Sequence, residues 1–110
     1  MKKIFLSLPM SGRSDEEIRA QIEQMKVEFL LKNPLDKGEL IEFVDNTDCP
    51  PIDSRDTVTP NLLYLGEAIR KLAYCDYAYF GKGWSKARGC LIEMEICKKY
   101  DIPYFINKNN

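Results

Sequence analysis

Residues 77–100, YAYFGKGWSKARGCLIEMEICKKY, combine a strand pattern, a loop and a helix pattern in one continuous stretch. Residues 77–80 form a short aromatic run of the kind found in buried strands, and Gly81 and Gly83 then open a loop. Helical periodicity begins near Gly89 and continues to the end of the stretch. We therefore predict a buried strand, a loop and a helix in this order.

A carboxylate lies on the apolar side of this predicted helix. At about 100° per residue, one side of the helix collects Gly89, Ile92, Glu93, Ile96, Cys97 and Tyr100. Glu95 lies on the opposite side and is expected to be solvated. Because an unpaired buried charge is costly, Glu93 must be paired, protonated or facing a wet cleft. We favour the cleft and a functional role, and the alternative is a glutamate at the edge of the core, bonded to the backbone or to Arg88.

Composition bounds the class of protein and its partners. The chain has 110 residues, which we interpret as one domain spanning 1–110, and its 16 basic and 17 acidic residues are interspersed. Without a basic face, no nucleic-acid polymer is expected as a partner. The apolar run at the N-terminus is too short for a signal peptide, and no segment has the length of a membrane span. We therefore expect a cytoplasmic protein without a membrane partner.

Missing residue types exclude several kinds of chemistry. The four cysteines have no CxxC spacing and the chain has no histidine, so neither a zinc site nor a histidine-based catalytic triad is expected. Neither GxxxxGK[ST] nor a GxGxxG motif after the first strand is present, which disfavours nucleoside triphosphatase work and nicotinamide cofactors. We predict no metal and no cofactor, and carboxylate chemistry remains.

The rest of the chain alternates strand and helix patterns. Strands are predicted at 3–8, 40–44, 77–80 and 104–106. Ser14 has capping-box spacing to Glu17 and begins a helix that ends before Asn33. Thr59 is the predicted N-cap of another helix, with Pro60 at its first position. Residues 45–59 are rich in aspartate and lack periodicity, and we interpret them as a lid.

This alternation predicts the topology. It indicates parallel βαβ units with right-handed crossovers, and thus a three-layer α/β domain of flavodoxin or Rossmann type with about four strands in the order 2-1-3-4. Ligands bind such sheets where the chain direction reverses, here between the first and third strands. Loops 8–13 and 81–89 should meet there, and each opens a helix whose N-terminal N–H groups suit an anion. Glu93 is expected to overhang this crevice.

The two loops supply candidate ligand contacts. Ser7, Ser11, Gly12 and Arg13 suit an anion or a ribose, and the alternative is a capped turn with a solvated arginine. Trp84 in the second loop either stacks on a base or anchors the packing.

Three motifs together resemble a known family. Residues 7–12 are Ser-Leu-Pro-Met-Ser-Gly, residues 83–84 are Gly-Trp, and residues 88–93 are Arg-Gly-Cys-Leu-Ile-Glu. The chain from Ile4 to Ile106 resembles the nucleoside 2-deoxyribosyltransferase superfamily, in particular a short bacterial and phage branch. The resemblance implies that Glu93 is a nucleophile that attacks the anomeric carbon of a nucleoside or nucleotide and forms a covalent glycosyl-enzyme. It also implies a homo-oligomer and sugar or 5′-phosphate contacts for Ser11, Gly12 and Arg13. We predict further substrate contacts for Ser7, Met10, Trp84, Ser85 and Gly89.

Ala87 departs from the family pattern. Six residues before the nucleophile, the transferases tend to carry Asp and the nucleotide hydrolases Ser, whereas here Ser85 is displaced by two positions. The departure removes a group that protonates or orients the leaving base, or that contacts a phosphate. Two functions therefore stay open, an enzyme acting on an N-glycosidic bond and a non-catalytic module that binds a nucleotide-like metabolite. A third interpretation is an oligomerising accessory domain that uses Leu91 and Met94, which the helix pattern places off the core face.

Overall fold

The computed structural model of the chain describes residues 1–32, 34–35, 38–49 and 59–107. The elements in these ranges are β1 (Lys2–Ser7), α1 (Asp15–Lys32), β2 (Ile41–Val44), α2 (Pro60–Leu72), β3 (Tyr77–Phe80), the short 3-10 helix η1 (Trp84–Lys86), α3 (Arg88–Lys99) and β4 (Tyr104–Ile106). No helix in the described ranges is both long enough and apolar enough to cross a membrane.

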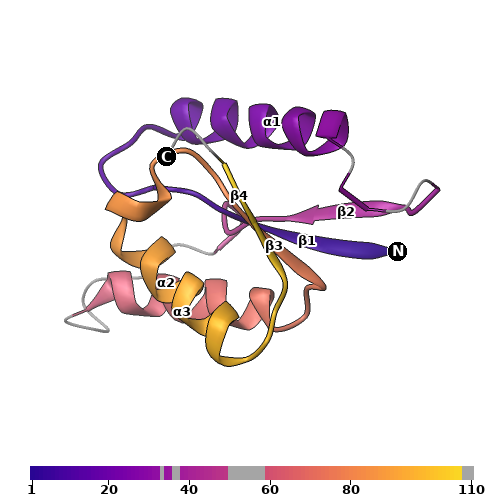
Figure 1. Cartoon of the computed structure of the whole chain (residues 1–110). Coiled ribbons are helices and arrows are strands. Elements are labelled where there is room, and N and C mark those ends of the chain that lie inside the picture. The colour runs from indigo at the N-terminus through magenta and orange to yellow at the C-terminus, as the bar shows by residue number, and fades with distance from the viewer. Residues whose placement is uncertain (33, 36–37, 50–58, 108–110) are drawn as a thin grey trace.

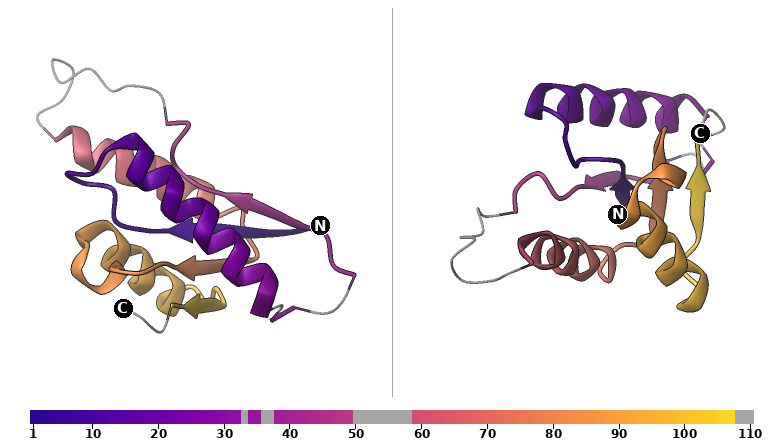
Figure 2. Two further views of the ribbon diagram at one scale, coloured as in Figure 1. Left: turned by 90° about the horizontal axis from the view of Figure 1, so that it is seen from above. Right: turned by 90° about the vertical axis from the view of Figure 1, so that its left-hand side faces the viewer.

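The strands form one parallel sheet in the order β2-β1-β3-β4, which confirms the predicted topology. β1 is central, and Ile4 lies opposite Phe43 of β2 and Tyr77 of β3. Helix α1 covers one face of the sheet, while α2 and α3 cover the other, so the domain has three layers (Figures 1 and 2). The chain places β2 on one side of β1 and β3 on the other, so the direction in which strands are added reverses between β1 and β3, as the alternating pattern predicted.

Side chains of β1 alternate between the two halves of the core. Ile4 and Leu6 belong to a cluster with residues of α1, whereas Phe5 belongs to a second cluster with residues of α2 and α3. All three are at most 1% exposed, so β1 is buried on both faces, as predicted. Ser7 follows Phe5 by two positions, and the strand period therefore places it on the α3 face.

The capping box of α1 forms as predicted. The Glu17 amide donates to Ser14 Oγ at 3.2 Å, and the Ser14 amide donates to Glu17 Oε1 at 3.3 Å. Helix α2 begins at Pro60, but the Thr59 side chain before it makes no capping hydrogen bond. Thr59 nevertheless occupies the N-cap position with Pro60 at the start of the helix, as predicted, and its carbonyl accepts from the Leu62 amide at 3.0 Å.

The buried face of α3 differs from the predicted one. It consists of Cys90, Glu93, Met94 and Cys97. Met94 is 3% exposed, so the interpretation that it lies off the core face is wrong, whereas Tyr100 is 77% exposed and lies beyond the helix end. Two apolar stripes overlap in this sequence, and periodicity does not choose between them. Packing against α2 and β3 selects the stripe that contains the cysteines.

The predicted lid is described only in part, because residues 50–58 lie outside the described ranges. Residues 45–49 are joined to α2. The Asn46 amide donates to the Tyr64 carbonyl at 3.0 Å, and Lys71 Nζ donates to Asn46 Oδ1 at 3.1 Å and also bonds Asp48. These contacts fix the start of the segment against the helix.

Replacing the capping hydroxyl by Ser14→Ala should lower the free energy of unfolding by about 1 kcal/mol, because the Glu17 amide loses its acceptor. A urea titration measures the change. Ser14→Thr keeps the hydroxyl and should retain most of the stability. Equal losses in the two variants would show that the hydroxyl does not stabilise α1.

Candidate functional site

A cavity of about 690 Å³ lies beyond the carboxyl end of β1, at the crevice that the strand order predicts. Its described lining comes from the end of β1 and the loop after it, the start of α1, residues 46, 47 and 49, α2, and the start of α3 with the residues before it. The volume lies within the range of roughly 300–1,000 Å³ typical of small-molecule pockets.

Glu93 and Ser7 meet at the inner wall of this cavity. The Ser7 hydroxyl donates to Glu93 Oε1 at 2.6 Å, and the two residues are 2% and 6% exposed. Ser7 ends the central strand on the α3 face, while Glu93 lies on the buried side of α3. The pair thus joins two segments that are 86 residues apart in the sequence.

Burial sets the charge of Glu93. It raises the pKa of Glu93 from an ordinary 4.5 to about 7, and the hydrogen bond from Ser7 acts in the opposite direction. Arg88 was the expected alternative partner, but no Lys or Arg in the described part of the chain forms an ion pair with Glu93. Near pH 7 the carboxyl group is therefore divided between its charged and neutral forms, and carboxyl groups with a pKa shifted in this way concentrate at functional sites.

The structure brings together part of the predicted set of site residues. Ser7, Met10, Ser11, Gly89 and Glu93 line the cavity. Gly12, Arg13, Trp84 and Ser85 are not among its described lining.

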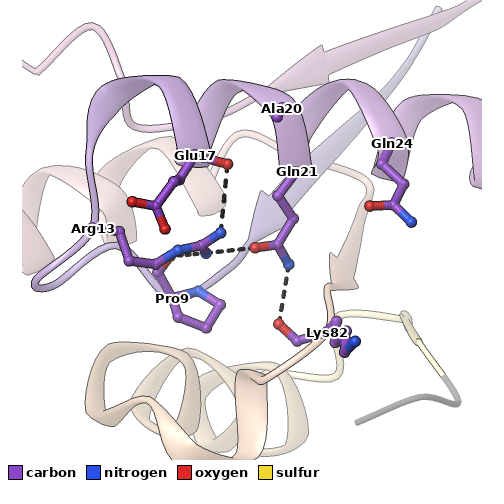
Figure 3. Close-up of a pocket in the computed structure, with 7 residues that line it drawn as sticks. All are labelled: Pro9, Arg13, Glu17, Ala20, Gln21, Gln24 and Lys82. Atoms are coloured by element: carbon purple, nitrogen blue, oxygen red, sulfur yellow. Dashed lines mark hydrogen bonds between the residues drawn. The ribbon is translucent and has the colours of Figure 1, made fainter.

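Arg13 turns away from this cavity and lies between α1 and the loop that carries Lys82 (Figure 3). There it lines a separate open pocket of about 560 Å³ with Gln21, Gln24 and Lys82 (Figure 3). Trp84 packs on Phe80, with ring centroids 5.5 Å apart, and contacts the core cluster beneath α3. This contact matches the packing interpretation of Trp84 that the sequence left open.

Three cations that the sequence did not indicate as ligand contacts line the cavity, namely Arg19, Lys86 and Arg88. They come from α1, η1 and the first position of α3. Lys86 and Arg88 flank Ala87, which also lines the cavity, so the departure from the family motif lies inside the site. Lys86 and Arg88 could have been predicted from the sequence, because they lie next to Ala87 in a loop expected at the crevice. Arg19 could not, because it reaches the cavity only through the packing of α1.

The cysteines near the site are poor nucleophiles. Cys90 lines the cavity and is 3% exposed, and burial raises the pKa of its thiol to about 11. Burial also raises the pKa of Cys49, which lies in the lining on the other side. A thiol must ionise to attack, so Glu93 is the better candidate nucleophile.

Neither a metal site nor a relative accounts for the cavity. Within the described ranges, no group of three or more Cys, Asp or Glu side chains is placed to hold a metal ion. Comparisons of the chain with protein-family models, with curated proteins and with solved structures found no match.

The raised pKa of Glu93 predicts how stability changes with pH. Between about pH 4.5 and about pH 7 the folded state keeps a proton that the unfolded state has lost. The contribution of Glu93 to the free energy of unfolding therefore falls as pH rises, by on the order of 3 kcal/mol across this window. The Glu93→Gln variant lacks this titration and should gain stability relative to the wild type as pH rises.

Urea titrations of both proteins at several pH values measure this difference. Glu95→Gln is the matched control, because Glu95 is exposed on the same helix. Parallel pH profiles for wild type and Glu93→Gln would contradict a raised pKa.

Proposed function

We propose that the protein cleaves or transfers the N-glycosidic bond of a (deoxy)nucleoside or its 5′-monophosphate, with Glu93 as the nucleophile. The observation that carries this proposal is the buried Glu93 carboxylate, bonded to Ser7 at 2.6 Å in the wall of a cavity of about 690 Å³. A buried carboxylate without a cation beside it costs stability, and such groups concentrate at functional sites. The resemblance to the nucleoside 2-deoxyribosyltransferase superfamily supports the same role.

The proposed reaction has two steps. Ser7 binds Oε1 of Glu93, and no donor in the described part of the chain reaches Oε2, which is the oxygen assigned to the attack. Oε2 bonds to the anomeric carbon while the bond from that carbon to the base nitrogen breaks, and the base leaves with the electron pair and takes up a proton. In the second step a different base or water attacks the same carbon, the bond from that carbon to Oε2 breaks and releases the Glu93 carboxylate, and the attacking group loses a proton to solvent. Water gives hydrolysis, whereas a base gives transfer.

Asp15 is the other carboxyl group of the described cavity lining. It is the first residue of α1 and is exposed. The residue at position 87 is alanine, so it cannot protonate the leaving base.

The charges of the lining support the 5′-monophosphate over the nucleoside. Arg19, Lys86 and Arg88 line the cavity and form no ion pair within the described ranges, and Asp15 and Glu93 are the acidic residues of the described lining. With Glu93 partly protonated, this lining is positive although the whole chain has a formal charge of −1. These cations would attract a phosphate dianion into the cavity.

The reaction is tested by incubating the protein with 2′-deoxynucleosides and their 5′-monophosphates, with and without a second free base. Chromatography follows the released or exchanged base. Glu93→Gln should abolish turnover, because an amide does not form the glycosyl ester. Glu95→Gln should leave turnover unchanged, and full activity in Glu93→Gln would refute the proposed nucleophile.

The phosphate preference is tested with Arg88→Gln. Loss of one charge-assisted contact should raise KM for the 5′-monophosphate about tenfold, equivalent to roughly 1.4 kcal/mol, and should leave KM for the nucleoside nearly unchanged. Lys98→Gln removes a charge from the other end of α3 and serves as the control. Equal effects of the two variants would assign the preference to overall charge.

The second candidate function is binding without turnover, and Ala87 in the cavity lining is the observation that favours it. A rise in melting temperature with 5′-monophosphates, without any base released, would support it over catalysis. Homo-oligomer formation remains a prediction. Leu91 is 44% exposed on α3, whereas the buried Met94 is not available for an interface.

A further inference from the structure

We propose that Arg13 and Gln21 form a bridge that holds the two cavity loops together, and that both are positioning residues rather than ligand contacts. The loops are 8–13, after β1, and 81–89, after β3. The effect of the bridge on loop geometry is independent of the proposed function, whereas its effect on turnover rests on that function.

The bridge is a continuous path of hydrogen bonds (Figure 3). Arg13 Nη1 donates to the Pro9 carbonyl at 2.7 Å and to Gln21 Oε1 at 2.5 Å, and Gln21 Nε2 donates to the Lys82 carbonyl at 3.0 Å. Arg13 Nη2 also donates to the Glu17 carbonyl at 3.4 Å. The path thus begins in one loop, passes through α1 and ends in the other loop. Since the guanidinium is bonded to the protein at these acceptors, it does not serve the cavity.

Close packing of the two loops supports the bridge. A Cβ at Gly81 would lie 2.9 Å from Gln21 Nε2, so the absence of a side chain there leaves room for the bridging amide. A Cβ at Gly83 would lie 3.2 Å from Pro9 Cγ, and Gly83 has a φ of +86°, which suits glycine. The Gly81 amide also donates to the Ser7 carbonyl at 2.8 Å. The loops are therefore in direct contact beside the bridge.

The bridge affects the cavity only through the loops. Pro9, Met10 and Ser11 line one side of the cavity, and residues 86–90 line another. Arg13 and Gln21 are absent from the described lining and lie on the outer side of the loops. Losing the bridge should therefore change the spacing of the walls without removing a ligand contact.

The chemistry of Gln21 allows the two halves of the bridge to be separated. An amide accepts from Arg13 and donates to Lys82, whereas a carboxylate accepts only. Gln21→Glu should therefore keep the bond to Arg13 and lose the bond to the Lys82 carbonyl. Gln24 is the matched control, because it lies one turn later on α1 and lines the same pocket of about 560 Å³ as Arg13 and Gln21, but donates to Glu28.

The readout for loop geometry is the fluorescence of Trp84, the only tryptophan of the chain. Trp84 follows Lys82 by two residues, and its Nε1 atom is buried. Arg13→Ala, Gln21→Ala and Gln21→Glu should each increase acrylamide quenching of Trp84, and Gln24→Ala should not. Arg13→Ala combined with Gln21→Ala should resemble the worse single variant, because both remove the same path.

The readout for the site is the KM for 2′-deoxynucleoside 5′-monophosphates, which should rise in the bridge variants while the kinetic pKa of Glu93 stays unchanged. Gln21→Glu, which keeps the side-chain volume, replaces Gln21→Ala if the alanine variant unfolds. The bridge would be refuted if the Arg13 and Gln21 variants showed no more quenching than Gln24→Ala. It would also be refuted if the effects of Arg13→Ala and Gln21→Ala on quenching were fully additive in the double variant. Altered quenching in a protein whose wild type has no turnover would support the bridge and refute the enzymatic function.

Discussion

The hydrogen bond from Ser7 to Glu93 joins the central strand to the helix that covers it, and the site depends on it. A carboxylate that is 6% exposed loses most of its hydration, so it needs a donor or a proton. Ser7 supplies this donor from the end of β1. The geometry in turn requires β1 to lie at the centre of the sheet with both faces covered, as it does.

Burial of Glu93 costs stability at neutral pH. Its raised pKa means that the folded state resists ionisation of the group, and this resistance weakens the fold as pH rises toward 7. Proteins keep such costly groups where chemistry requires them. The other buried polar contacts are of a more ordinary kind. Glu28, for example, accepts from Tyr79 and Asn107 and joins α1 to β3 and the end of β4, away from the cavity.

The residues of the two loops divide between the cavity and its outer support. Met10 and Ser11 face the cavity, whereas Arg13 is bonded to Pro9 and Gln21 on the far side. The positive charge around the cavity is supplied instead by Arg19, Lys86 and Arg88. One loop can thus be rigid on its outer side and open to a ligand on its inner side.

The sequence by itself determined the elements and their order. The double-sided apolar run of β1, the Ser14 capping box and the strand–helix alternation are local patterns, and the handedness of βαβ units converts them into the sheet order and the crevice. It also marked Glu93, because a carboxylate on an apolar side of a helix is visible from periodicity alone. Tertiary structure decided which side of α3 is buried, that Arg13 bonds to Gln21 and does not line the cavity, and that Arg19, Lys86 and Arg88 do line it. These depend on contacts between distant residues, such as Gln21 and Lys82 at a separation of 61 positions, and no local period encodes such contacts.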